Sequence, residues 1–263
     1  MACDISTNEL IACVFAREVQ DGDSLQCGAN AIVQRAGILL GHLHHGPNCR
    51  ILIGRTYANL YQVPVLELYE SNTDIRAARW GEYVIPHDES FSFASERQID
   101  LFCISALQID RYGNTNMIGI GSDIKRLKLR GPGGVGTTPA SANVRTLLIL
   151  MPHHERRVFV EKLDFLSGVG FGDGPGYREK YKLPGKGPTL VATPLGVFDF
   201  EPQSKRMRLK SLHPGVTVEQ VIENTGFELL IPDSVPTTPA PTEEEITILR
   251  NRIDPQGSLR SRK

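Results

Sequence analysis

The sequence predicts an α/β protein in which helices cover a parallel sheet. Three observations lead to this prediction. The chain has 263 residues, of which 40% are hydrophobic and 22% charged, typical of a globular protein with a substantial core. The first fifty or so residues alternate between helical and strand patterns. Two later apolar segments, Ile99 to Ser105 and Thr146 to Met151, are short enough to be buried strands.

The first predicted helix begins at Ser6. Glu9 follows three residues later, which is the spacing of a capping box, and apolar residues then recur at helical spacing. A short strand is expected from Ser24 to Cys27. A second helix is expected at about Ala31 to His42, followed by a strand from Arg50 to Ile53. This order of helix and strand favours parallel strand pairing.

Glycine and proline mark the turns of the second half. Residues 168–188 are so rich in both that they predict a loop. Leu190 to Thr193 and Val197 to Phe200 flank a Pro-Leu-Gly turn, which predicts a hairpin. Arg157 to Val160 is a further strand candidate, and Thr217 to Glu223 has the pattern of a short helix.

The chain is predicted to be a single domain, residues 1–263. A Pro-rich connector is expected at about residues 234–241, and a final amphipathic helix at about residues 242–253. From Arg55 to Asp88 the pattern has no clean period, so we expect irregular structure with short elements there.

The composition excludes several classes of function. A net charge of -1 provides no general field for a polyanion, so no nucleic acid is expected as a partner. The five cysteines are scattered and contain no CxxC pair, which favours reduced thiols in a cytoplasmic protein. Neither a basic leader nor an apolar run of about 18 residues is present, so no secretory signal and no membrane span are expected.

The histidines do not predict a metal site. On a helix, His42 and His45 share a face while His44 points elsewhere, and no carboxylate or thiolate lies nearby at ligand spacing. The other pair, in His153-His154-Glu155, does not form the HExxH pattern of a zinc protease. We therefore expect no metal.

The loop from Gly131 to Gly136, with the sequence GPGGVG, is the segment best suited to hold a ligand. It matches neither the dinucleotide fingerprint nor a phosphate-binding P-loop. Its glycines would let backbone N–H groups approach an oxyanion or a phosphate, although an ordinary surface turn has the same composition. The basic stretch before it, Lys125 to Arg130, is either a solvated strand face or a surface facing a phosphate-bearing ligand.

The segment Ala106 to Asn116 resembles a family signature. It contains the pattern QxDxxGNxN, which is similar to that of the β subunits of glutaconate-type enzymes in the class I CoA-transferase family. Further similar segments follow in the family's order, over about residues 6–257: Gly131 to Gly136, His154 to Asp164, Asp173 to Gly176, Thr193 to Phe200, His213 to Gly215, Glu223 to Phe227 and Ile253 to Pro255.

This resemblance implies an open, mostly parallel α/β fold and an acyl-CoA substrate. Coenzyme A then enters as part of the substrate, and no separate cofactor is expected. The family also implies an α-type partner subunit, in a heterodimer or heterotetramer with the active site between the subunits. By the same resemblance, the residues expected to bind substrate or CoA are Gln108, Asp110, Tyr112, Asn114, Gly131, Gly133 and Gly134.

The nucleophile position departs from the family pattern. In family members that transfer CoA, the strand after the second helix ends in Glu-Ser-Gly or Glu-Asn-Gly, and that glutamate attacks the thioester. Here Gly54-Arg55-Thr56 stands in its place, and glycine carries no nucleophile. Glu67 and Glu70 are the fallback candidates, because Glu70-Ser71-Asn72 imitates the motif further along the chain.

Three functions follow from the resemblance. The first is a β subunit that hydrolyses an acyl-CoA or cleaves a C–C bond in it. The β subunits of steroid-ring-cleaving CoA hydrolases are similar to this chain at Asp110 to Asn114, Val197 to Phe200 and Ser211 to Thr217. In those enzymes the family implies a carboxylate base from the α subunit and water attack on a ring carbonyl. The second is a CoA-transferase with a relocated glutamate. The third is a non-catalytic subunit that shapes a pocket or binds a nucleotide.

Overall fold

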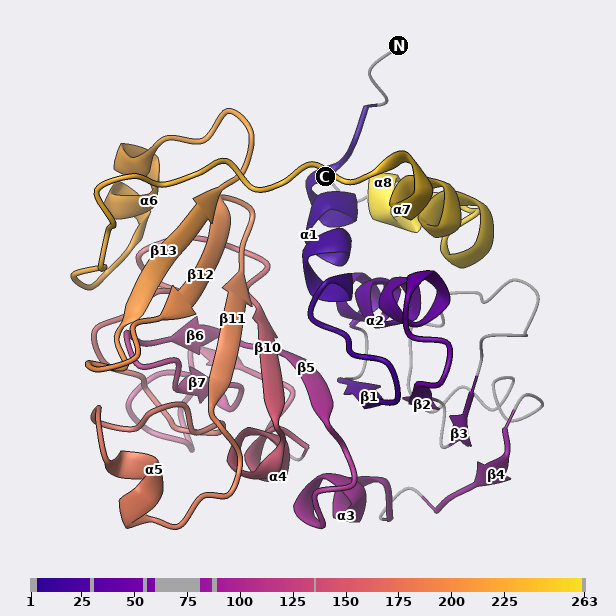
Figure 1. Cartoon of the computed structure of the whole chain (residues 1–263). Helices are drawn as coiled ribbons and strands as arrows, with labels where there is room; N and C mark the ends of the chain where they lie inside the picture. Colours follow the sequence, from indigo (N-terminus) through magenta and orange to yellow (C-terminus); the bar gives the residue numbers. More distant parts are fainter. Residues whose placement is uncertain are drawn as a thin grey trace. The chain divides into compact units, whose positions relative to one another are not determined.

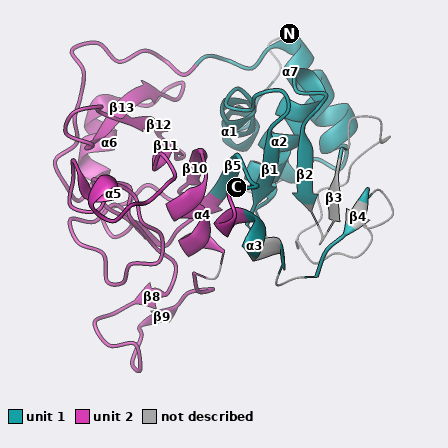
Figure 2. Cartoon of the chain, turned by 60° about the horizontal axis from the view of Figure 1, so that its bottom comes forward, with its two compact units in different colours: residues 1–93, 98–103, 239–263 teal, residues 94–97, 104–238 magenta. Residues whose placement is uncertain are grey.

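The computed structural model describes residues 4–28, 31–53, 56–59, 81–86, 89–134 and 136–261. Two compact units make up the chain (Figure 2). Unit 1 comprises residues 1–93, 98–103 and 239–263, and unit 2 comprises residues 94–97 and 104–238. The assignment of the chain to a single domain stays a prediction.

Parallel strands form the centre of unit 1. Strand β1 (Ser24–Cys27) pairs in parallel with β2 (Arg50–Ile53) on one side and with β5 (Leu101–Ser105) on the other. Two antiparallel strands, β3 (Thr56–Ala58) and β4 (Tyr83–Val84), continue from β2. The strands predicted at residues 24–27 and 50–53 are confirmed, as is the parallel pairing.

Helices α1 (Thr7–Ala16) and α2 (Ile32–His44) pack closely together in unit 1 (Figure 1). The predicted capping box is present: the Ser6 hydroxyl accepts the Glu9 N–H, and the Glu9 carboxylate accepts the Ser6 N–H. Gly37 of α2 permits the close approach, because a Cβ there would lie 2.9 Å from a backbone carbonyl of α1. Helix α2 ends two residues later than predicted.

The C-terminal segment also belongs to unit 1. Helix α7 (Glu243–Ile248) begins with a capping box and continues as a π-helical turn, η2 (Leu249–Ile253), so the predicted final helix is confirmed in position. Arg250 of this turn donates from Nε to the buried carboxylate of Glu9 at 2.7 Å. A short helix, α8 (Ser258–Ser261), follows it, and another short helix, α3 (Glu89–Ser95), precedes β5.

The sheet of unit 2 has one parallel and two antiparallel pairings. Strand β10 (Thr146–Leu150) lies parallel to β11 (Pro188–Ala192), which forms the predicted hairpin with β12 (Gly196–Phe200). Strand β13 (Met207–Leu212) extends this sheet in antiparallel fashion. The strand predicted at residues 157–160 is wrong. That segment forms a turn, and only Phe159 makes an isolated bridge, because its partner strand is too short to extend the pairing.

Two small antiparallel pairs and three helices complete unit 2. They are β6 (Gln108–Ile109) with β7 (Thr115–Asn116), β8 (Gly119–Ile120) with β9 (Leu129–Arg130), α4 (Thr137–Asn143), α5 (Tyr177–Lys180) and α6 (Val218–Asn224). The predicted short helix near residue 217 is therefore confirmed, with Thr217 as its N-cap. In the described part of the chain, no helix combines the length and apolar character needed to cross a bilayer.

The three histidines at the end of α2 each contact a different group, and the Nδ1 atoms of His44 and His45 also lie 3.1 Å apart. His42 is buried, its Nδ1 lies 2.7 Å from the Gly46 carbonyl oxygen, and burial lowers its pKa. His45 Nε2 lies 3.0 Å from the Val19 carbonyl oxygen, and His44 Nε2 lies 3.5 Å from a carboxylate oxygen of Glu244.

Another histidine, His154, lies in the core of unit 2. Its ring stacks on that of Phe159 with the centroids 3.9 Å apart. The two ring nitrogens lie 3.0 and 3.1 Å from the hydroxyl oxygens of Thr193 and Thr225. Burial lowers the pKa of His154 to about 4, so the ring stays neutral in the folded state at neutral pH.

We expect the free energy of unfolding to fall as the pH drops from about 6.5 towards about 4. An unfolded chain protonates this histidine near pH 6.5, whereas the folded chain does so only near its lowered pKa of about 4. The unfolded state therefore binds more protons through this window, and one such shift amounts to roughly 3 kcal/mol. Urea titrations between pH 7.5 and 4 should show a shallower pH dependence for His154→Gln than for the unchanged chain. If the unfolding free energies of both proteins changed equally with pH, His154 would not be the source of this pH dependence.

Candidate functional site

A half-buried aspartate, Asp110, fixes the turn of the β6–β7 hairpin. One oxygen of Asp110 accepts the N–H groups of Tyr112 and Asn114 at 2.9 and 3.0 Å. The other accepts Nδ2 of Asn114 at 2.7 Å. The turn requires Gly113, which has φ +70° and would place a Cβ 2.6 Å from the Phe200 ring. Burial raises the pKa of Asp110 despite these donors. The carboxylate accepts these hydrogen bonds from the residues of its own turn.

Asn114 joins this turn to the loop around Gly172. Its Nδ2 also donates to the Gly172 carbonyl at 2.7 Å, and its Oδ1 accepts the N–H groups of Gly170 and Gly172 at 2.9 and 3.1 Å. With the bond to Asp110, this uses the two donors and two lone pairs that an amide side chain offers. The 5% exposure of Asn114 indicates a structural contact.

Asn116 extends the network to the next segment. Its Nδ2 donates to Gln108 Oε1 and to the Gly119 carbonyl, each at 2.8 Å, and its Oδ1 accepts the Ile118 N–H at 2.9 Å. Gln108 Oε1 also accepts the Asp164 N–H at 3.1 Å. The signature side chains thus hold residues 117–119 in place.

The Gly-rich loop lies along this positioned segment. Gly131 N–H donates to the Ile118 carbonyl at 2.8 Å, and Gly133 N–H donates to the Met117 carbonyl at 3.0 Å. A Cβ on Gly131 would lie 2.2 Å from the Met117 oxygen, and Gly133 has φ +91°. Both glycines are therefore required by the backbone, and their N–H groups are already bonded.

Gly134 differs from its neighbours in the loop. Its N–H has no acceptor among the residues that the structure describes. Its carbonyl accepts the N–H groups of Thr137 and Thr138, where α4 begins. Ser167 packs against Gly134, because a Cβ on Gly134 would lie 2.8 Å from Ser167 Cβ. Ser167 Oγ also accepts the Met117 N–H at 2.9 Å. Gly134 as a whole is half-buried.

The predicted binding residues have different contacts in the structure. Gln108 bonds to Asn116, which holds residues 117–119 beside the Gly-rich loop, whereas Asp110 and Asn114 hold the β6–β7 turn and the loop around Gly172. The contact of any of them with substrate stays a prediction. Tyr112 is half-buried, and its ring lies beside Gly174. Sequence reasoning assigned no role to Ser167. No signal in the sequence marks a serine whose contacts with the loop arise only through folding.

The basic stretch before the loop lies on the β8–β9 hairpin, which is labelled in Figure 2. Lys125, Arg126, Lys128 and Arg130 are all exposed. This fits a solvated strand face, and an encounter with a phosphate-bearing ligand stays a prediction.

In unit 1, the parallel strands end at one edge of the sheet. Since β1, β2 and β5 run in the same direction, their carboxyl ends share that edge, where open α/β sheets bind ligands. Gly54 follows the last residue of β2, Ile53, directly in the sequence. Gly54, Glu67 and Glu70 lie outside the described residues.

Cys27 and Cys103 face each other in register on β1 and β5. Both are buried, and burial raises the pKa of each thiol. Since a thiolate is the nucleophilic form of cysteine, neither thiol is suited to attack a thioester.

Comparisons with known proteins identify the family of this chain. The family described as coenzyme A transferase matches residues 73–224. Over 246 residues the chain is 36% identical to the β subunit of 3-oxoadipate CoA-transferase from Pseudomonas knackmussii, which covers 93% of this chain and 92% of the relative. The chain belongs to the coenzyme A transferase family. The resemblance at Ala106 to Asn116 is thereby confirmed.

Two other relatives have known structures. The β subunit of glutaconate CoA-transferase from Acidaminococcus fermentans is 30% identical over 95% of this chain and 93% of the relative. Its crystal structure has a TM-score of 0.86 at 29% identity and covers 99% of both chains. The cholesterol ring-cleaving hydrolase IpdB subunit from Rhodococcus jostii is 36% identical over 60% of this chain and 61% of the relative. The IpdAB crystal structure has a TM-score of 0.81 at 25% identity over 98% of both chains. These similarities confirm the predicted α/β fold and the β-type subunit.

Proposed function

We propose that this chain is the β-type subunit of a heteromer that hydrolyses an acyl-CoA or cleaves a C–C bond in it. The observation that carries the proposal is the glycine at position 54, directly after β2. Transfer through a glutamyl-CoA thioester requires a carboxylate at the attacking residue. Gly54 supplies none, so water is the nucleophile that remains for a reaction at the carbonyl carbon.

The proposal includes an α-type partner subunit that supplies the catalytic base. Both full-length relatives are, by name, one subunit of a larger enzyme. Two acids of the signature region, Asp110 and Asp164, support this need for a partner. Asp110 accepts hydrogen bonds within its own turn, and Asp164 Oδ2 accepts the Gly121 N–H at 2.8 Å. Neither is placed as a free general base.

The Gly134 N–H is the group that we assign to the oxyanion. Water attack on a carbonyl places negative charge on the carbonyl oxygen, and a fixed backbone N–H stabilises that charge without reorganisation. The Gly131 and Gly133 N–H groups hold the loop in shape through Met117 and Ile118. The Gly134 N–H, in contrast, has no acceptor among the described residues, and it is the donor of this loop that we assign to the oxyanion.

CoA transfer is the second candidate function. The full-length relatives named above are both CoA-transferases, which favours it. In this chain it would require Glu67 or Glu70 to act as the nucleophile. The two candidates differ in one intermediate, because only transfer forms a covalent thioester on this chain.

Trapping with borohydride tests the choice. We expect the reconstituted heteromer, incubated with acyl-CoA and acetate, to form no acetyl-CoA and to leave no borohydride-sensitive adduct on this chain. Glu67→Gln and Glu70→Gln should keep most of the activity. The isolated chain serves as the control and should be inert. An adduct mapped to either glutamate, together with acetate-dependent exchange of CoA, would establish transfer and overturn the proposal.

A further inference from the structure

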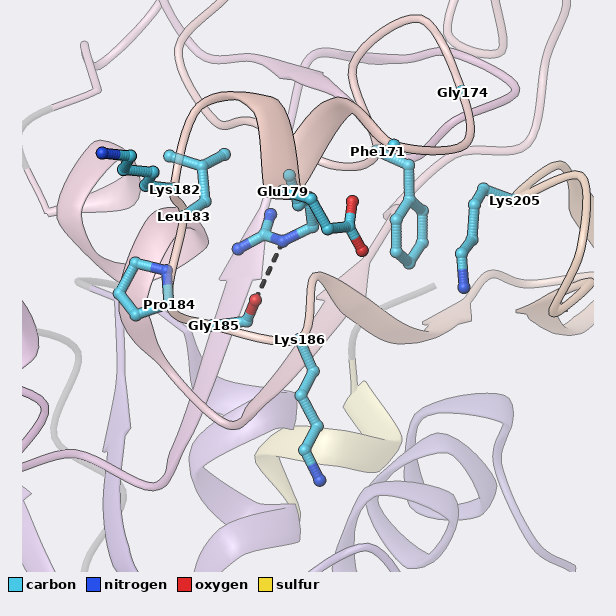
Figure 3. Close-up of a pocket in the computed structure, with 11 residues that line it drawn as sticks. Phe171, Gly174, Glu179, Lys182, Leu183, Pro184, Gly185, Lys186 and Lys205 are labelled. Carbon is cyan, nitrogen blue, oxygen red and sulfur yellow. Dashed lines mark hydrogen bonds between the residues drawn. The ribbon is translucent and has the colours of Figure 1, made fainter.

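A cavity of about 620 Å³ lies in unit 2, beside α5 (Figure 3). Its lining includes one aromatic ring and five charged side chains: Phe171, Arg178, Glu179, Lys182, Lys186 and Lys205. Four of these are cations and one is a carboxylate, which gives a net charge of +3 (4 − 1), whereas the whole chain has a net charge of -1. A concave, positively charged site of this kind concentrates anions.

Arg178 is the fixed charge of this cavity. It is only 6% exposed. Its Nε donates to the Gly185 carbonyl at 2.9 Å, a bond drawn in Figure 3. Its two terminal nitrogens donate to the carbonyls of Gly170 at 2.8 Å and Ala142 at 2.9 Å. Every hydrogen-bond acceptor of Arg178 within the described residues is a backbone carbonyl, which is neutral. The guanidinium is therefore held rigidly while its positive charge is not neutralised by these bonds.

Two of the lysines have an unusual backbone. Lys182 and Lys205 have φ values of +52° and +58°, and they are two of the three non-glycine residues with positive φ in the described ranges. Such conformations are disfavoured for residues with a side chain, and they cluster where a fold holds a ligand. The Lys205 Nζ lies 5.4 Å from the centre of the Phe171 ring, which places the ammonium at the cavity wall (Figure 3).

We propose that this cavity binds a phosphate group. Phosphate suits it because lysine ammonium groups bind phosphate in proteins, and a dianion would offset most of the +3 charge. Arg178 contributes its charge but no free N–H, because its nitrogens already donate to five backbone carbonyls. The carboxylate of Glu179 points into the same space in Figure 3 and limits the affinity. Two sources carry this chemistry: the phosphates of coenzyme A, and a free nucleotide or inorganic phosphate.

The position of the cavity favours coenzyme A as the source, and this part rests on the proposed function. Helix α4 links the two sites, since the Gly134 carbonyl accepts bonds at its start and the Ala142 carbonyl accepts from Arg178 at its end. Seven helical residues span about 10 Å. Coenzyme A carries its phosphates at the far end of the pantetheine arm from the thioester, so one molecule has the length to reach both sites.

Direct binding measurements on the heteromer test this proposal. Calorimetric titrations would use CoA, 3′-dephospho-CoA, ADP and inorganic phosphate with three variants. Lys205→Gln should weaken binding about three- to fivefold, and Glu179→Gln should strengthen it by a similar factor, as for single partly exposed charges. Lys210→Gln, an exposed lysine on β13 outside the cavity, is the matched control and should change nothing. Both effects should diminish as salt is raised.

The ligands separate the two sources. If coenzyme A occupies the cavity, Lys205→Gln weakens the binding of CoA. Comparing CoA with 3′-dephospho-CoA then shows whether the cavity holds the 3′-phosphate. If a free nucleotide or phosphate occupies it, the variants change the affinity for ADP or inorganic phosphate and leave the affinity for CoA unchanged. Unchanged affinity for all four ligands in both Lys205→Gln and Glu179→Gln, with normal melting temperatures, would overturn the proposal. Since turnover is not measured, that outcome leaves the proposed function standing.

Discussion

Gly134→Ala should lower the kcat of the reconstituted heteromer a hundredfold or more while acyl-CoA affinity stays near normal. A Cβ at this position would lie 2.8 Å from Ser167 Cβ, so the peptide must shift away from its place in the loop. A displaced N–H no longer meets the oxyanion, and losing one such donor costs about 3 kcal/mol of transition-state stabilisation. The measurement is kcat, acyl-CoA affinity and melting temperature on the same preparation.

Gly133→Ala is the matched control for this prediction. The Gly133 N–H already donates to the Met117 carbonyl, and a Cβ there would have no atom within 4 Å. With φ at +91°, the substitution strains only the backbone and should cost about 1 kcal/mol of stability. We therefore expect a lower melting temperature and little change in kcat. If Gly134→Ala behaved like this control, the loop would be structural and the oxyanion assignment would have to be withdrawn.

Local signals predicted the helices and strands of the first fifty residues, the β11–β12 hairpin and the last long helix. Ser6 and Glu9 are three residues apart, and their capping box forms as expected because it depends only on neighbouring backbone groups. The hairpin of β11 and β12 likewise follows from its own turn. The predicted strand at residues 157–160 failed because a strand also needs a partner of matching length. Phe159 finds only the two-residue β6, so pairing ends after one bridge.

The site was harder to predict than the fold. The signature showed which polar residues matter, but it did not show whether they face the ligand or the protein. Asn114 bonds to Gly172, 58 residues away, so its role depends on contacts that exist only after folding. The same holds for Ser167, which meets Gly134 and Met117 across long separations. The absence of a glutamate at Gly54, in contrast, is a property of the sequence alone.

Asn114→Ala should lower the free energy of unfolding by about 3–5 kcal/mol, within the range expected for breaking a buried polar network. The substitution removes four hydrogen bonds. It leaves the Gly170 and Gly172 N–H groups, the Gly172 carbonyl and one oxygen of Asp110 without this partner. Water cannot readily replace it, because Asn114 is only 5% exposed. Urea denaturation of the purified chain measures the loss directly.

Asn224→Ala is the control for that experiment, because its side chain makes one exposed hydrogen bond, from Nδ2 to the Gln220 carbonyl at 2.8 Å. A surface change of this kind should alter stability by less than about 0.5 kcal/mol. The pair of variants separates a positioning role for the signature from direct substrate contact. If Asn114 has a positioning role, the Asn114→Ala variant loses stability, and its lost activity is partly recovered at low temperature, where the network re-forms. If Asn114→Ala instead kept its unfolding free energy and lost activity at every temperature, Asn114 would contact the substrate, and the signature would belong to the binding surface.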